Sequence, residues 1–378
     1  MPVKRLHIIC FDIPFPPSYG GVIPVFYRIK ALNKLGVRVI LHCFYKGVKG
    51  ETEPLEALCE KVYYYPRKTS FLQQLSFRPY GVASRDSDEL LHDLLQDDAP
   101  IFFEGLVSCA LMSHPALRNR AKYFRECNVE HDYYHALGRA TKSLWKKLYL
   151  HIEAERLRWF ERTVRNASAI FTLAHQDEAY FKKTYPRVPN IYFPCFHGHT
   201  AILPPIGEPQ PYILYHGNLS VAENHKAAMY IVRQIAPKIP YPVVIAGLHP
   251  SDELRRAVQG APKITLVDSP DEETMQRLIR NARIHLLITF QGTGIKLKLL
   301  NVLFTEGHVI VNPPMTEGTE LADLCHTGSD EEQLLQLCTS LFEQPMDHQA
   351  LNRRLEQLNA SYSDERSARI IYQTIFEQ

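Results

Sequence analysis

The sequence of 378 residues has no apolar run long enough to cross a bilayer. A transmembrane helix needs about 20 consecutive, mostly apolar residues. The residues after Met1 lead directly into an expected strand, without the apolar stretch of a secretory signal peptide. The sequence therefore predicts a cytoplasmic protein whose contact with a membrane is at most peripheral, at the inner membrane face.

Cysteine pairs with the spacing of metal ligands are also missing. The eight cysteines are scattered along the chain, and several stand in apolar runs. This distribution is typical of reduced, buried thiols in a cytosolic protein. Neither a metal site nor a metal requirement is predicted.

The chain has little net charge, and it has no tandem repeat and no low-complexity segment. Forty-three basic residues stand against forty-one acidic ones, which gives +2 at pH 7. This balance argues against a nucleic-acid partner, which would need a basic surface. Hydrophobic residues make up 45% and charged residues 22%, as in globular proteins. A chain of this length is expected to form two domains.

Short apolar runs of strand length alternate with segments of helical apolar spacing. Such alternation indicates parallel strands in doubly wound sheets. The strands predicted for the first domain, residues 1–200, are 6–11, 37–44, 62–65, 101–103, 123–125, 169–173 and 191–193. A single long helix is expected over residues 136–166, with a charged face that either lies on a membrane surface or is simply solvated.

A break follows at residues 194–211, where five prolines and no periodic pattern indicate a linker. Alternation resumes in the second domain, residues 210–360, with predicted strands 212–216, 243–246, 264–267, 285–290 and 309–311. A last helix, within residues 362–378, is expected to pack back on the first domain. The predicted fold class is therefore α/β, with two doubly wound, Rossmann-like domains that face each other across a cleft. Ligands are expected in this cleft, at the carboxyl ends of the strands.

The stretch 285–318 carries the sharpest functional signal. A predicted strand ends in the turn 291–294, Gln-Gly-Thr-Gly, and a helical pattern follows. The first N–H groups of a helix have no intrahelical partner, so such a turn favours an anion. Lys296 and Lys298 stand in the first helical turn, where they either bind an anion or are ordinary surface lysines.

Several segments resemble one family, in order along the chain. They are 16–21 (PPSYGG), 125–134 (RECNVEHDYY), 167–174 (ASAIFTLA), 214–220 (LYHGNLS) and 294–301 (GIKLKLLN). Together they resemble glycosyltransferases of the GT-B fold, and in particular the retaining, family 4-like enzymes that use nucleotide sugars. The order and spacing of these segments over nearly the whole chain carry the resemblance.

The resemblance implies that the second domain binds the donor. Related enzymes usually have a glutamate where Asn301 stands, for the ribose, and an acidic residue where Thr293 stands, for the transferred sugar. Both acids are missing here. The usual arginine and lysine after the first strand of this domain are not evident either. Asn218 stands near the position of the arginine, and Asn224 or Lys226 near the position of the lysine.

Lys296 and the N–H groups of residues 292–294 are then the leading diphosphate ligands, with Lys296 in a catalytic role as the cation that stabilises the leaving group. The predicted donor-binding residues are Gly217, Asn218, Lys226, Gly292, Thr293, Gly294, Lys296 and Asn301. His216, just before this set, is a further candidate for donor contact.

The first domain is expected to hold the acceptor. Gly20 and Gly21 either let the backbone approach a sugar or phosphate, or make a tight turn into a helix. Glu104, at a strand end, is expected to point toward the cleft. A third group consists of Glu126, Glu130 and His131, of which Glu126 and His131 are the predicted catalytic residues. His131 either orients or deprotonates an acceptor hydroxyl, or is a histidine satisfied at a helix start.

The predicted activity is transfer of a hexose-like sugar from a nucleoside-diphosphate sugar to a glycan, lipid-linked or small-molecule acceptor. Retention of configuration is implied by the resemblance. No cofactor is expected beyond this co-substrate, because cations and amides take the place of a metal.

Two alternative functions stay open. One is a catalytically degenerate GT-B subunit that binds a nucleotide sugar without turnover; the other is a nucleotide-sugar 2-epimerase, which needs more acids and histidines in the cleft than the sequence offers.

Overall fold

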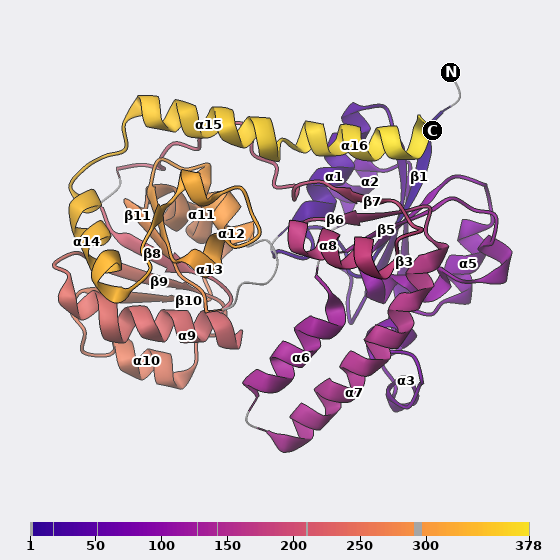
Figure 1. Cartoon of the computed structure of the whole chain (residues 1–378), viewed down its shortest axis with the longest axis horizontal. Helices are drawn as coiled ribbons and strands as arrows, with labels where there is room; N and C mark the ends of the chain where they lie inside the picture. Colours follow the sequence, from indigo (N-terminus) through magenta and orange to yellow (C-terminus); the bar gives the residue numbers. More distant parts are fainter. Residues whose placement is uncertain are drawn as a thin grey trace. The chain divides into compact units, whose positions relative to one another are not determined.

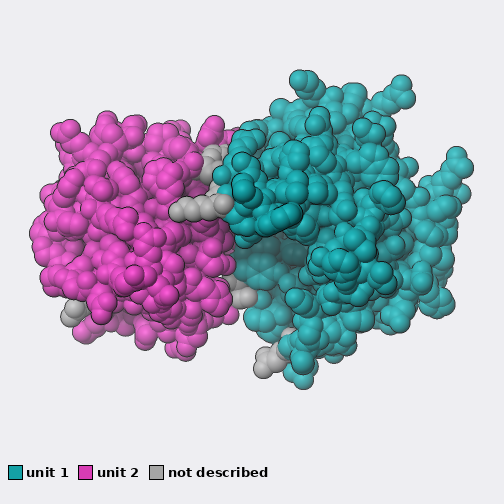
Figure 2. Space-filling model, turned by 90° about the horizontal axis from the view of Figure 1, so that it is seen from below, with its two compact units in different colours: residues 1–196, 362–378 teal, residues 197–361 magenta. Residues whose placement is uncertain are grey.

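A computed structural model of the protein describes residues 3–17, 19–50, 52–126, 128–141, 143–208, 211–290 and 297–377. The chain divides into two compact units, each with its own parallel sheet (Figures 1 and 2). Unit 1 consists of residues 1–196 and 362–378, and unit 2 of residues 197–361. The C-terminal helix therefore belongs to unit 1. None of the described helices is long and apolar enough to span a bilayer.

Unit 1 is built on a seven-stranded sheet in the order β3-β2-β1-β4-β5-β6-β7. The strands are β1 (Arg5–Cys10), β2 (Arg38–Tyr45), β3 (Lys61–Pro66), β4 (Ile101–Glu104), β5 (Lys122–Arg125), β6 (Ala169–Thr172) and β7 (Asn190–Tyr192). All seven predicted strands are confirmed. The central strands are buried over most of their length. Burial on both faces is why parallel strands appear in a sequence as continuous apolar runs.

The helices of unit 1 connect these parallel strands. They are α1 (Ile23–Lys34), α2 (Glu53–Leu58), α3 (Phe71–Gln74), α4 (Tyr80–Ala83), α5 (Asp88–Leu94), α6 (Glu130–Ala140), α7 (Leu144–Phe160), α8 (His175–Thr184) and α16 (Asp364–Phe376). The C-terminal α16 packs on α1, and Ser367 Oγ donates to the carbonyl oxygen of Pro194 at 3.2 Å (Figure 1). These contacts fix the end of the chain to the sheet on which it began.

The single long helix expected over residues 136–166 is wrong. The structure has two antiparallel helices, α6 and α7, followed by a 3₁₀ segment at Glu161–Asn166 (Figure 1). Ser143 begins α7, and its hydroxyl accepts a hydrogen bond from the Lys146 N–H at 3.4 Å. This N-cap satisfies one of the unpaired donors of the new helix. We call α6 and α7 together the α6–α7 hairpin.

Unit 2 is built on a six-stranded sheet in the order β10-β9-β8-β11-β12-β13. The strands are β8 (Ile213–His216), β9 (Val243–Gly247), β10 (Ile264–Asp268), β11 (Ile284–Leu287), β12 (His308–Val311) and β13 (His326–Thr327). The helices are α9 (Ala222–Tyr230), α10 (Asp252–Val258), α11 (Glu272–Asn281), α12 (Leu297–Leu303), α13 (Pro313–Thr316), α14 (Glu331–Phe342) and α15 (His348–Tyr362), which ends at the first residue of the returning segment of unit 1. The five predicted strands are confirmed. The two-residue β13 is too short to give a sequence signal.

Candidate functional site

The donor-side residues of unit 2 gather where its strand order reverses. β8 lies between β9 and β11, and ligands of doubly wound sheets bind at such a switch point, outside the carboxyl ends of the strands. Gly217 follows β8 directly, and the expected phosphate-binding turn follows β11 by a few residues. The predicted ligands of that turn, Gly292, Thr293, Gly294 and Lys296, lie outside the described residues. Their roles stay predictions.

Lys298, in the first turn of α12, brings an ammonium group to this switch point. Its Nζ donates to Asn224 Oδ1 at 3.0 Å and to the Tyr215 hydroxyl at 3.5 Å, and lies 4.9 Å from the centre of the Tyr215 ring. Asn224 in turn donates through Nδ2 to the carbonyl oxygen of Asn218 at 3.0 Å. These side chains connect α12 to the turn after β8. The sequence alone gave no reason to rank Lys298 above Lys296, because its partners lie about 75 residues away in the chain.

The turn after β8 passes very close to the neighbouring strand. A Cβ on Gly247, at the end of β9, would lie 1.7 Å from the carbonyl oxygen of Gly217, and a Cβ on Gly217 would lie 3.2 Å from the Asn224 side chain. Asn218 Oδ1 accepts hydrogen bonds from the N–H and the hydroxyl of Ser220, at 3.1 and 2.7 Å. Asn218 therefore uses its side chain to shape its own turn.

A second lysine of the predicted donor set lies on α9. Lys226 on α9 places its Nζ 4.3 Å from the centre of the ring of Phe290, the last described residue before the expected phosphate-binding turn. Such a contact between a cation and a ring face is attractive. Asn301 lies further along α12, and its buried Oδ1 receives no hydrogen bond from the described residues. Among the predicted donor-binding residues, the described helices therefore carry one cation, Lys226, and one amide oxygen without a hydrogen bond from the described residues, that of Asn301.

The histidines near this point are neutral. Burial, followed by the charge of Lys298, lowers the pKa of His216 to about 3. Burial also lowers the pKa of His285 on β11 far below its usual range. Neither imidazole carries a charge at physiological pH, so neither can contribute positive charge toward an anionic ligand. Among the described residues, Lys298 on α12 and Lys226 on α9 are the lysines of the predicted donor region.

The segment that leads from β11 into the turn is held on two sides. The Thr289 N–H donates to Asn312 Oδ1 at 2.9 Å, and Asn312 Nδ2 donates back to the Thr289 carbonyl oxygen at 2.7 Å. The Thr289 hydroxyl donates to Glu223 on α9. These bonds fix the residues before the turn to β12 and α9, which is the kind of support that a precise binding site needs.

In unit 1, the loop between β1 and α1 holds the two predicted glycines. Gly20 is exposed, and a Cβ there would touch nothing within 4 Å. A Cβ on Gly21 would instead lie 2.7 Å from the Tyr19 ring and 3.0 Å from the Phe11 ring. The Tyr19 hydroxyl donates to Asp12 Oδ2 at 2.6 Å. A side chain at position 21 would therefore have to displace the Tyr19 and Phe11 rings, while Gly20 leaves the backbone accessible at the surface.

Two charged residues near this loop, Arg85 and Glu130, have pKa values shifted by burial. Arg85 is 6% exposed, and its Nε and Nη1 donate to the carbonyl oxygens of Phe11 and Gly81 at 3.0 and 2.8 Å. Burial lowers the pKa of Arg85 to about 10. Burial also raises the pKa of Glu130, at the start of α6, to about 7, although the charge of Arg85 acts against this rise. A carboxyl group that is half ionised at neutral pH is suited to exchanging a proton with a substrate.

Glu104 does not face an open site, contrary to expectation. It is the last residue of β4 and is 0% exposed. Its Oε2 accepts a hydrogen bond from Arg125 at 3.1 Å, and its Oε1 forms an ion pair with Arg28. The Arg28 guanidinium also lies 5.0 Å from the centre of the Phe102 ring. Two buried guanidinium groups need a carboxylate partner, so Glu104 stabilises the interior of unit 1.

The two predicted catalytic residues of unit 1 are buried as well. Glu126 is 0% exposed, and its Oε1 accepts a hydrogen bond from the backbone N–H two residues later, at 3.4 Å. His131 is 7% exposed, and its Nδ1 lies 3.4 Å from Glu161 Oε2. The hydroxyls of Tyr180 and Tyr185 donate to the same carboxylate at 2.8 Å each. This burial contradicts a role in which Glu126 or His131 touches a substrate, and it places His131 in the interior of unit 1 beside Glu161, at the start of α6.

The comparisons with known proteins start from a weak sequence signal. No family model matches the chain. An uncharacterized 44.6 kDa protein in the cps region of Klebsiella pneumoniae is 24% identical over 338 residues, which cover 84% of this chain and 85% of the relative. Among solved structures, sucrose-phosphate synthase from Thermosynechococcus elongatus has a TM-score of 0.68 at 15% identity, with 98% of both chains covered. The chain has the GT-B fold.

A second GT-B structure matches over the same extent. HepE from Anabaena, solved in complex with UDP and glucose, has a TM-score of 0.66 at 10% identity and covers 99% of this chain and 100% of its own. The predicted fold class and the resemblance to GT-B proteins are thus confirmed. Identities this low establish the fold, so any residue role has to come from the geometry of the chain itself.

Proposed function

We propose that this GT-B protein is a glycosyltransferase that moves a hexose-like sugar from a nucleoside-diphosphate sugar to an acceptor. The observation that carries the proposal is the Lys298 ammonium group at the switch point of unit 2, bonded to Asn224 beside the close turn at Gly217. A cation at this point of a doubly wound sheet suits a phosphate ligand. HepE, which has the same fold, binds UDP in its structure, so uridine nucleotides are the first donors to test.

The proposed chemistry needs stabilisation of a leaving group. As the sugar departs, negative charge grows on the diphosphate, and fixed cations lower the energy of that state. We assign this task to Lys298, to Lys226 and to the predicted ligands of the 291–296 turn, Lys296 among them. Asn301 is proposed to bond the ribose as a neutral amide. Transfer through these groups requires no metal ion, and retention of configuration is the outcome expected for enzymes of this resemblance.

Unit 1 supplies the acceptor side in this proposal. Glu130 is proposed to orient the attacking hydroxyl by accepting its hydrogen bond, because its pKa of about 7 leaves it partly ionised at neutral pH; in a transfer with retention the hydroxyl proton passes to the departing diphosphate. The charge of Arg85 lowers that pKa from a still higher value, and so keeps part of the Glu130 population ionised. Gly20 leaves the neighbouring backbone open to a sugar. This assignment replaces the buried His131 and Glu126 with Glu130, which is partly exposed.

The surface of the α6–α7 hairpin favours a lipid-linked acceptor over the glycan and small-molecule classes. Apolar side chains on α7 are between 43% and 83% exposed: Leu144, Trp145, Leu148, Tyr149, Ile152 and Trp159. The nearby segment 71–77 adds Phe71, Leu72, Leu75 and Phe77, and Arg156 of α7 donates to its Gln74 carbonyl oxygen at 3.1 Å. The same helix carries Lys146, Lys147, Arg156 and Arg158. Apolar side chains combined with basic ones are typical of helices at an anionic bilayer surface.

Sedimentation with vesicles that contain anionic lipid tests this membrane contact. The wild-type protein is expected to sediment with the vesicles, and a double variant with Trp145→Ser and Leu148→Ser to stay in the supernatant. Val48→Ser is the matched control, because Val48 is 95% exposed in a different loop of unit 1. Undiminished vesicle binding by the double variant would overturn the assignment to α7, while leaving the transfer proposal to its own test.

Two rival functions make different predictions in one assay. A panel of nucleotide sugars is incubated with and without acceptors, and release of nucleoside diphosphate is measured. Acceptor-dependent release, lost in Glu130→Gln, supports the transferase. A 2-epimerase would change the sugar without any acceptor, and a degenerate subunit would bind the nucleotide without any chemistry. Either of those results would replace the proposal.

A further inference from the structure

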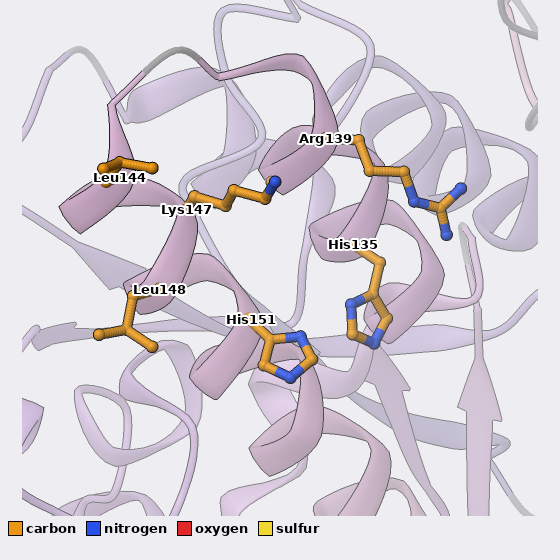
Figure 3. A pocket seen from close by; sticks show the side chains of 7 residues that line it. His135, Arg139, Leu144, Lys147, Leu148 and His151 are labelled. Atoms are coloured by element: carbon orange, nitrogen blue, oxygen red, sulfur yellow. The ribbon is translucent and has the colours of Figure 1, made fainter.

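Three side chains with metal-binding atoms meet on the α6–α7 hairpin. His135 comes from α6, and His151 and Glu155 come from α7. One potential ligand atom from each residue lies within 4.8 Å of the other two. His135 Nε2 is 3.3 Å from Glu155 Oε1, and the two imidazole rings lie 5.2 Å apart, centre to centre. Figure 3 shows the His135 and His151 rings beside each other, each on its own helix.

We propose that His135, His151 and Glu155 form a zinc site that joins α6 to α7. Imidazole nitrogen and carboxylate oxygen are ligands that Zn²⁺ accepts in proteins, whereas Mg²⁺ and Ca²⁺ prefer shells of oxygen atoms. The proposal does not depend on the glycosyl transfer proposed above, because none of these three residues has a role in it, although Glu130 lies on the same helix α6. The α6–α7 hairpin would then bind a zinc ion that the proposed glycosyl transfer does not use.

The spacing of the three residues suits such a site. His151 and Glu155 are four positions apart on one helix, so their side chains project from the same face one turn apart. Ligand atoms about 2.1 Å from zinc in a tetrahedral shell lie about 3.4 Å from one another. The 3.3 Å between His135 and Glu155 already has this length. Binding of the ion requires side-chain rotation to shorten the remaining distances, and the partial exposure of these groups leaves space for it.

The cluster is partly exposed and borders a cavity, so a fourth ligand can reach an ion bound there. The His135 and Glu155 side chains are 23% and 51% exposed, so an ion can reach them from solution. Both histidines line a cavity of about 390 Å³, which also includes Lys147 and Arg139. In Figure 3, Arg139 points away from the imidazoles and Lys147 extends toward α6. Water or a small anion in the cavity would complete the coordination, and a nearby ammonium group favours the anion.

An ion pair between His135 and Glu155 is the simpler account of part of this geometry. It explains the 3.3 Å contact, but it does not involve His151, which approaches the same two groups from the next turn of α7. A comparable two-residue pair occurs elsewhere in unit 1, where His175 Nδ1 lies 3.2 Å from Glu178 Oε2. That pair provides the matched control, since it has one imidazole and one carboxylate and belongs to no group of three among the described residues.

Calorimetric titration with ZnCl₂ tests the proposal on the full-length protein after dialysis against a chelator. The wild type is expected to bind one zinc ion at a saturable site, and to bind Mg²⁺ weakly or not at all. His135→Ala, His151→Ala and Glu155→Gln should each lose at least about tenfold in affinity, since even changes outside the coordination shell cost 10- to 100-fold. His175→Ala should bind zinc as the wild type does.

Hydrogen exchange provides a second measurement that reports where the ion binds. Zinc is expected to slow amide exchange in α6 and α7 of the wild type, because an ion bound to both helices opposes their separation, and to leave exchange unchanged in His151→Ala. Absence of a saturable zinc site in the wild type would overturn the proposal. So would zinc binding that survives in His135→Ala and His151→Ala, because the ion would then be held elsewhere.

Discussion

Replacement of Lys298 by alanine is the most direct perturbation of the proposed donor site. The lysine lies in the first turn of α12, and its ammonium group bonds to Asn224 and to the Tyr215 hydroxyl. In the proposal it also bonds a phosphate oxygen. Alanine removes the charge and both hydrogen bonds, so the loss of binding should depend on whether the ligand carries phosphate.

The expected loss of binding free energy follows from the charge of Lys298 and its partial burial. Two unit charges about 4 Å apart attract each other by about 4 kcal/mol at an effective dielectric constant near 20, a value typical of partly exposed protein sites. Lys298 is partly buried, and solvent reduces the net gain. Hydrogen bonds to charged groups contribute about 1.5–3 kcal/mol in measured series. We therefore expect Lys298→Ala to weaken nucleoside-diphosphate binding by a factor of about 10 to 150.

Calorimetric titration with UDP and with uridine separates the phosphate contribution from the base contribution. The affinity for UDP should fall strongly in Lys298→Ala, and any affinity for uridine should change little. Lys298→Gln keeps a donor for Asn224 without the charge, so it should behave like the alanine variant if charge is the cause. Lys263→Ala is the matched control, because Lys263 is exposed and stands just before β10, at the amino end of the strand.

Two results would refute this reasoning. Equal losses for UDP and uridine would mean that Lys298 supports the shape of the site and not the phosphate. Full UDP affinity in Lys298→Gln would mean that its hydrogen bonds to Asn224 and Tyr215 matter and that its charge does not. In either case the positive charge at the switch point would have to come from another residue, and Lys226 would become the first candidate.

Three further changes test the remaining assignments. Lys296→Ala should weaken nucleoside-diphosphate binding more than nucleoside binding in the same titrations, and equal losses would count against its phosphate role. Glu130→Gln should lower kcat and remove a pH dependence in which wild-type activity falls as pH drops through about 7, where Glu130 takes up a proton. Because burial raises the pKa of Glu130 in the folded state, wild-type stability should fall as pH rises from the ordinary glutamate pKa to about 7 and stay lower above it. Urea unfolding at pH 8 should therefore show the variant more stable by at most about 3 kcal/mol. Glu104→Gln should lower the free energy of unfolding by about 3–5 kcal/mol, since it leaves Arg28 and Arg125 without their shared carboxylate; lost activity at full stability would instead return Glu104 to the acceptor site.

The fold was predictable from the sequence because its signal is local. Every strand of a parallel sheet covered on both faces needs an apolar run, and runs such as 101–103 and 213–216 stand between polar turns. The alternation with helical spacing then leaves few topologies to choose from. The hairpin was missed because apolar spacing continues across residues 140–144 without a proline to interrupt it. The N-cap at Ser143 was the available signal.

The sequence locates strand ends but does not show which polar residues near them are buried. A strand end such as Glu104 marks the correct edge of the sheet, but the sequence does not show that Arg28 from α1 and Arg125 from β5 enclose its carboxylate. The same limit applies to Glu130, whose raised pKa depends on burial that no local pattern reveals. Burial and long-range pairing decide which of several polar residues near a strand end stays accessible.

The distribution of charged and neutral residues on the donor side suggests which part of the donor each residue contacts. Positions 293 and 301, where related enzymes usually have acids, hold a threonine and an asparagine, while lysines stand at 226, 296 and 298. Neutral groups at the first two positions give up charge-assisted bonds to sugar hydroxyls, and the cations keep a strong attraction for the diphosphate. Binding energy placed on the diphosphate acts on the group whose charge grows in the transition state. Under the proposed function, the lysines of unit 2 would therefore stabilise the leaving diphosphate without either acid.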